Sequence, residues 1–364
     1  MQEVNLTSDE KEFDYAFKFK GGIKKDLVVP MFLEGAQNAI DVLRKLKPVL
    51  PEININIVNN STLGAYATKV DMKYFIGINH GTYMLLFALF GRMLGNKAIL
   101  SNVGNSINEV DPEKLFNIHI LDINLLAAIA EPVIPVDSTR MALVVWLANK
   151  AVQTITIHEY AHIINGHCDH MLNINSNGVI TENLRHNSIV SSEDMMLSQT
   201  LEFDADAYST QKGLTLLNIE WNQKVFRDEL NSVFKSFSDM LYMWSFANYS
   251  IWKLFGVGNY DLDRLSTYSH PTPSIRQRFA LDLISTLYLD SNKYDEVVGA
   301  CLNAALEADR SFEKLSQTVE TLKGWKINQD PRCEEHMQRL MKNWKNVRPL
   351  LEPYAINGLA PIQE

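Results

Sequence analysis

The sequence predicts an α+β fold, with a small sheet in the first third of the chain and helices over most of the remainder. Apolar and polar residues alternate in ININIVNN, residues 53–60, which is typical of a strand with one buried face. No proline occurs from Val136 to His270, which permits long helices in that stretch. At 364 residues and 46% hydrophobic, the chain can bury a sizeable core.

Three segments before Val136 predict the rest of the sheet and the helices next to it. EGAQNAIDVLRKLK, residues 34–47, is predicted to be a helix that ends at Pro48. A further strand is expected within residues 65–78. The uncharged stretch at residues 74–91 is interpreted as a core strand followed by a core helix, because it carries Asn79, His80, Thr82 and three glycines, whereas a membrane span needs roughly 20 mostly apolar residues.

Charge and cysteine content exclude several classes of protein. A net charge of −9 and a pI near 5.5 argue against a nucleic-acid or anionic-membrane partner, since phosphate binding needs clustered Lys and Arg. The polar, acidic N-terminus does not resemble a signal peptide. Three cysteines without short spacing indicate neither a disulfide framework nor a cysteine-based zinc site. We therefore expect a soluble cytoplasmic protein of undetermined oligomeric state.

The main chemical signal lies in TIHEYAHIINGHCD, residues 156–169. A helix is predicted here, capped at Ser138 or Thr139 and stopped by Gly166. On it, His158 and His162 are four residues apart, so both imidazoles lie on one face and can bind a single zinc ion. Glu159 lies about 100° away around the helix, beside the metal, where it can take a proton from the attacking water. This is the H-E-x-x-H pattern of zinc hydrolases.

A catalytic zinc site needs a third protein ligand. His167 and His170 follow the predicted helix end and are expected at the surface. SSEDMMLSQTLEFDADAYSTQKG, residues 191–213, predicts a second helix that Ser191 caps and Gly213 ends. Its Glu202 and Asp206 share one face, so Glu202 is predicted to bind zinc and Asp206 to accept the free N–H of a zinc-bound histidine. Asp204 faces elsewhere.

Together, HEYAH (158–162), EFDAD (202–206) and HPTPSIR (270–276) resemble the gluzincin peptidases of the HtpX and CAAX prenyl protease group. The resemblance covers roughly residues 50–290. It implies a zincin-like fold, with an edge strand near residues 66–78 along which a peptide substrate lies. It also implies that His270 and Arg276 point at the substrate side of the zinc. Members usually carry membrane spans, which are not expected here, and the soluble layout is loosely similar to the phage-exclusion peptidase Lit.

The expected function is a soluble endopeptidase that acts on an intracellular protein or peptide, with one Zn²⁺ per chain and a zinc-activated water deprotonated by Glu159. The alternatives are a non-proteolytic zinc-binding module and a zinc amidase for a small substrate. His270 is expected to donate a hydrogen bond to the developing oxyanion, with a local structural role as the alternative.

Three zones are predicted along the chain: an N-terminal segment at 1–50, a catalytic domain at 51–290 and a C-terminal helical extension at 291–364. An Asn-rich insertion at 168–190 is either a lid or a surface loop. The aromatic stretch at 242–260 is expected to pack in the core behind the site.

Overall fold

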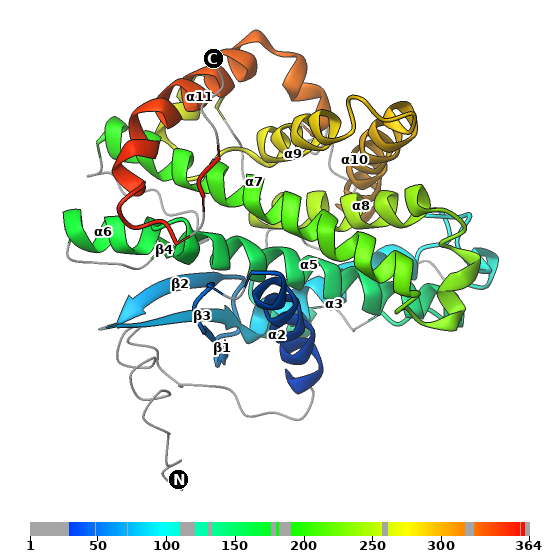
Figure 1. Cartoon of the computed structure of the whole chain (residues 1–364). Coiled ribbons are helices and arrows are strands. Elements are labelled where there is room, and N and C mark those ends of the chain that lie inside the picture. The colour runs from blue at the N-terminus through cyan, green and yellow to red at the C-terminus, as the bar shows by residue number, and fades with distance from the viewer. Residues whose placement is uncertain are drawn as a thin grey trace, which may run out of the picture.

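The computed structural model describes residues 29–47, 49–70, 72–109, 121–129, 133–175, 180–181, 191–256, 261–316, 324–356 and 358–360. These residues are mostly helical and contain one small mixed sheet, which confirms the α+β class (Figure 1). The sheet lies on one side of the long helix α5 (Ser138–Ile164), and α7 (Ser192–Gln223) lies across its other side (Figure 1). Helix α5 is therefore the centre of the fold.

Four strands form the sheet in the order β1-β3-β2-β4. Strand β1 (Asn54–Val58) pairs in parallel with β3 (Lys73–Asn79), and β3 pairs antiparallel with β2 (Ala65–Val70). The two-residue β4 (Ile180–Thr181) pairs antiparallel with β2. Both predicted strand regions are confirmed, and the second of them is a β2–β3 hairpin.

The sheet order corrects the expected edge strand near residues 66–78. Strand β3 is an interior strand, so residues 73–78 do not lie at an edge and that part of the prediction is wrong. The outer edge of β2 carries β4, which pairs with Tyr66 and Ala67. The chain itself thus occupies two positions of the edge at which a peptide was expected to bind.

The helices before α5 pack with the sheet. Helix α2 (Val29–Leu46) ends just before Pro48, as predicted, and α3 (His80–Leu94) directly follows β3. The stretch at 74–91 is therefore a core strand and a core helix, also as predicted. Helix α4 (Ile123–Ile129) is short. Across the described ranges, we find no helix with the length and apolar character that crossing a bilayer requires.

Helix α5 begins one residue earlier than the predicted caps. The Asp137 carboxylate, not Ser138 or Thr139, accepts the hydrogen bond from the Arg140 backbone N–H, because aspartate in an extended conformation is an equally good N-cap. At the other end, Gly166 has a φ of +82°, a left-handed conformation that glycine adopts without steric cost. Helix α6 (His167–Asn175) starts immediately after this turn.

Helix α7 is longer than the sequence predicts. Ser191 caps it as expected, but the helix continues ten residues beyond Gly213 to Gln223. Gly213 is not a stop signal: a Cβ atom there would lie 2.7 Å from Cζ2 of Trp244, so glycine allows α8 (Phe237–Phe255) to approach α7 closely. The predicted end at Gly213 is therefore wrong, for a packing reason that the local sequence does not reveal.

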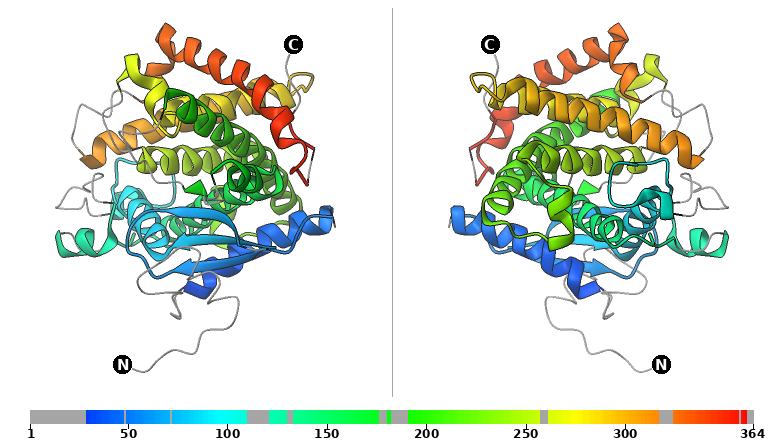
Figure 2. Two further views of the ribbon diagram at one scale, coloured as in Figure 1. Left: turned by 90° about the vertical axis from the view of Figure 1, so that its left-hand side faces the viewer. Right: turned by 90° about the vertical axis from the view of Figure 1, so that its right-hand side faces the viewer.

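The C-terminal part adds three helices, α9 (Pro273–Leu287), α10 (Tyr294–Ser316) and α11 (Pro331–Leu351). Two side views show α10 and α11 on the side of the molecule opposite the sheet (Figure 2). Short 3₁₀ helices connect the elements: η1 (Ser106–Asn108), η2 (Asp228–Ser232), η3 (Leu262–Thr267) and η5 (Trp325–Gln329).

One buried cluster runs from Ala36 on α2 to Leu315 on α10 and so crosses the zone boundaries expected at residues 50 and 290. The described part of the aromatic stretch lies within this core, in α8, as predicted. The expected insertion at 168–190 contributes α6 and β4. Its residues 176–179 and 182–190, like residues 257–260 of the aromatic stretch, lie outside the described residues, so the choice between lid and surface loop stays open.

Candidate metal centre

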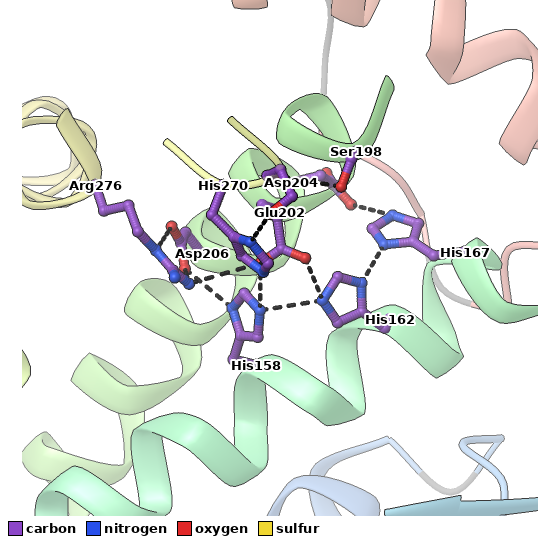
Figure 3. Close-up of polar contacts among 10 residues, drawn as sticks. His158, His162, His167, Ser198, Glu202, Asp204, Asp206, His270 and Arg276 are labelled. Atoms are coloured by element: carbon purple, nitrogen blue, oxygen red, sulfur yellow. Dashed lines mark hydrogen bonds and ion pairs between the residues drawn. The ribbon is translucent and has the colours of Figure 1, made fainter. Parts of the chain in front are cut away.

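His158, His162 and Glu202 converge on one point between α5 and α7 (Figure 3). The two Nε2 atoms of the histidines are 3.0 Å apart. Glu202 places Oε2 3.1 Å from His158 Nε2 and Oε1 3.4 Å from His162 Nε2. Ligands at about 2.1 Å around a tetrahedral zinc lie roughly 3.4 Å from one another. The three predicted ligand atoms therefore have the spacing of a metal site.

The other ring nitrogen of His158 is held by Asp206. His158 Nδ1 lies 2.9 Å from Asp206 Oδ1. Arg276 donates to the same carboxylate from Nε and from Nη2, both at 2.7 Å. Burial acts to raise the pKa of Asp206, but the Arg276 charge and the hydrogen bond from His158 outweigh it, and the pKa lies below its ordinary value. Asp206 is thus a fixed anionic acceptor between His158 and Arg276.

The 2.9 Å contact of His158 Nδ1 with Asp206 indicates which atom of His158 is available to a cation. A carboxylate accepts and does not donate, so Nδ1 of His158 carries the hydrogen. In the neutral ring, Nε2 then presents its lone pair to the Glu202 carboxylate and to His162 Nε2. Lone pairs and a carboxylate at these separations, all buried, repel one another unless a cation lies between them. The donor set of two imidazoles and one carboxylate suits zinc.

His162 is supported differently, through a second imidazole. Its Nδ1 lies 2.9 Å from Nδ1 of His167, and Nε2 of His167 lies 3.1 Å from Asp204 Oδ2 (Figure 3). Asn165 also donates to Asp204 Oδ2, at 2.6 Å. His167 is 0% exposed and His170 is 6% exposed, so the predicted surface positions of both are wrong. At the left-handed Gly166 the chain passes from α5 directly into α6, whose His167 and His170 are buried.

Glu159, the predicted general base, lies next to His158 on α5 and is fully buried. Its charge affects Cys168 on α6: burial, together with Glu159 and Asp169, raises the pKa of the Cys168 thiol. The three cysteines are all buried and unpaired. No distance here tests the proton-transfer role of Glu159, which stays a prediction.

His270 lies close to the predicted ligands. Its Nε2 is 3.6 Å from Glu202 Oε2, and its Nδ1 is 2.9 Å from the Ser269 hydroxyl. Two residues of α7 fix the preceding loop: Gln199 donates to the carbonyls of Leu265 and Tyr268, at 2.8 and 2.7 Å, and Ser198 donates to that of Ser269. His270 therefore lies on a fixed loop before α9 and not on a helix, as its His-Pro sequence predicts. Its role toward an oxyanion stays a prediction.

Arg276 contacts the residues that support the metal ligands. Besides its two bonds to Asp206, its Nη2 lies 3.8 Å from Glu202 Oε2, and its guanidinium stacks 3.5 Å from the ring centre of Trp252. The Trp252 ring also faces His158, with ring centres 5.8 Å apart. Arg276 is thus engaged on the protein side of the site, and the substrate contact that the resemblance implies stays a prediction.

All these side chains are buried. None of the predicted site residues is more than 5% exposed. They are His158, Glu159, His162, Glu202, Asp206, His270 and Arg276.

Sequence reasoning missed the contribution of His167, Asp204 and Asn165. The usable signal was the Asn165-Gly166-His167 run, since a glycine at a helix end can adopt a left-handed conformation from which a new helix starts in another direction. Comparison with protein-family models, with curated proteins and with solved structures gave no match for this chain.

Proposed function

We propose that this chain is a zinc-dependent endopeptidase that hydrolyses peptide bonds of a protein substrate. The observation that carries the proposal is the convergence of His158 Nε2, His162 Nε2 and the Glu202 carboxylate within 3.0–3.4 Å, with Glu159 adjacent on the same helix. The geometry supports a hydrolytic metal site, and the resemblance of HEYAH, EFDAD and HPTPSIR to gluzincin peptidases suggests that its substrate is a peptide bond. This resemblance rests on the motifs alone.

The residues have distinct roles in this proposal. His158, His162 and Glu202 would hold the zinc ion, which would supply Lewis-acid polarisation of a carbonyl and a water of lowered pKa. Glu159 takes the proton of the attacking water and later delivers it to the leaving amine. His270 donates a hydrogen bond to the oxyanion that develops on the carbonyl. Asp206 fixes the ring of His158, and Arg276 fixes Asp206.

The number of ligands favours catalysis over a purely structural zinc. Structural zinc sites in proteins are closed by four protein ligands, whereas catalytic sites have three and leave a position for water. In the part of the chain that the structure describes, the group able to hold a metal has three members. A base next to the ligands also has no function in a structural site.

The proposal is tested with purified zinc-loaded protein and its Glu159→Gln variant. Each is incubated with a cell lysate, and newly formed protein N-termini are sequenced. We expect discrete new N-termini with the wild type and nearly none with Glu159→Gln, because a positioned base contributes roughly 10²–10⁴-fold to the rate. Both proteins should contain equal zinc. Identical N-termini with both would exclude Glu159 as the base, and none with the wild type would exclude an endopeptidase and favour the small-substrate amidase.

A further inference from the structure

We propose that His167 and Asp204 form a positioning pair for the metal ligand His162, and that they fix its tautomer and its ring orientation. The inference rests on the zinc site of the proposed function and concerns two residues, His167 and Asp204, to which the sequence analysis gave no role at the site. It begins from the chain of contacts His162–His167–Asp204 (Figure 3), each member of which is at most 3% exposed.

Asp204 sets the direction of the chain of hydrogen bonds. Its Oδ2 lies within 2.6 Å of the Asn165 amide nitrogen and 3.1 Å of His167 Nε2. The Asn165 amide nitrogen can only donate, and a carboxylate that receives it from one side acts as an acceptor toward His167 as well. Nε2 of His167 therefore carries a hydrogen. In a neutral ring, Nδ1 of His167 is then a bare acceptor.

The same argument passes to His162. Its Nδ1 faces the bare Nδ1 of His167 at 2.9 Å, so Nδ1 of His162 must carry the hydrogen and donate it. The lone pair of His162 is then left on Nε2, the atom that faces His158 and Glu202. The tautomer that a metal requires is thus specified by a carboxylate two side chains away. The contact also strengthens the ligand, because a hydrogen bond from the free N–H makes the opposite nitrogen more basic.

The two ligand histidines are supported in parallel but unequal ways. His158 reaches its carboxylate, Asp206, directly. His162 instead contacts His167 at the start of α6, and His167 in turn contacts Asp204. One helix, α7, supplies Glu202, Asp204 and Asp206. Because α7 packs between α5 on one side and α9 and α11 on others, acids on different faces of it remain buried.

The first experiment measures zinc affinity by competition with a chromophoric chelator. Partners behind a metal ligand typically contribute 10–100-fold to affinity, so we expect His167→Leu to bind zinc about tenfold to a hundredfold more weakly than wild type. Asp204→Asn should weaken binding in the same direction. His170→Gln is the matched control, since His170 lies on the same helix, is nearly as buried and packs its ring against Tyr354. It should bind zinc as the wild type does.

A double variant separates a coupled pair from two independent effects. If His167 and Asp204 act as one unit, His167→Leu with Asp204→Asn should lose little more affinity than His167→Leu alone. Wild-type affinity in His167→Leu, or strictly additive losses in the double variant, would overturn the proposal. Failure of the proposed function has a different signature, namely a wild-type protein that binds no zinc or cleaves no protein.

A second measurement uses the wild-type protein and does not depend on how variants fold. Nitrogen-15 NMR of the histidine side chains in zinc-loaded protein distinguishes protonated from bare ring nitrogens. We expect His167 to carry a hydrogen on Nε2, and His162 to carry its hydrogen on Nδ1. Loss of a signal in His167→Leu assigns it. A hydrogen on Nδ1 of His167 would overturn the proposal, because His167 could then not accept from His162.

Discussion

Replacing Arg276 with methionine distinguishes its observed position from the substrate contact that the motif resemblance implies. In the structure, Arg276 is 3% exposed and donates two 2.7 Å hydrogen bonds to Asp206. Removing one partner of a buried, hydrogen-bonded ion pair costs about 3–5 kcal/mol, because the remaining charge stays buried without compensation. The Trp252 ring would lose its stacked guanidinium as well. We therefore expect the zinc-free variant to be less stable by about that amount.

Thermal unfolding of the zinc-free protein measures this loss. An unfolding entropy of about 2.1 cal/mol/K per residue gives about 0.76 kcal/mol/K for 364 residues. A loss of 3–5 kcal/mol then lowers Tm by about 4–7 °C. Arg278→Met is the matched control, because Arg278 pairs with Asp282 at 2.9 Å on the same helix but is 35% exposed, and exposed pairs contribute about 1 kcal/mol or less. Equal Tm values for Arg276→Met and wild type, with reduced turnover alone, would refute the placement.

Three further predictions concern the site and its surroundings. Replacing His158 by alanine should abolish stoichiometric zinc in metal analysis, and full retention would exclude the site. In His270→Ala, kcat should fall roughly 10²–10³-fold with KM and zinc content near wild type, as for loss of an oxyanion donor; a loss of zinc would instead assign His270 to the structure of the site. Burial, aided by Arg339, lowers the pKa of His336 to about 4. Because the unfolded chain binds that proton near pH 6.5, the contribution of His336 to stability is complete above this pH and decreases toward pH 4. Between pH 7 and pH 5, the free energy of unfolding of the zinc-free wild type, measured with urea, should decrease by about 2 kcal/mol more than that of His336→Gln. Equal decreases would contradict this.

Local patterns predicted the strands, the helix α5 and the convergence of His158, His162 and Glu202. Fixed spacings explain this: four residues separate His158 from His162, and the helical period alone places them on one face. Glu202 and Asp206 follow the same rule on α7. Each of these predictions needs only the geometry of one helix, together with the requirement that a metal has enough ligands.

What could not be predicted depends on contacts between elements. Asp204 appeared to face away from any function because the helical period directs it away from Glu202, and only the packing of α7 against the α5–α6 turn brings it to His167. Gly213 appeared to be a helix stop because its partner Trp244 lies on another helix. The pairing of β4 with β2 joins residues more than 100 positions apart, which no local pattern specifies.

In the proposed endopeptidase, the burial of the site and the pairing of β4 with the sheet edge would make turnover depend on a conformational equilibrium. No predicted site residue is more than 5% exposed, and β4 pairs with Tyr66 and Ala67 on the sheet edge. For a peptide to pair with Tyr66 and Ala67, β4 would have to leave this sheet edge. The apparent dissociation constant of a substrate is its intrinsic value divided by the open fraction, so an open population of about 1% would weaken apparent binding about a hundredfold. Substitutions or partners that shift this population would then change the rate without altering any atom of the metal centre.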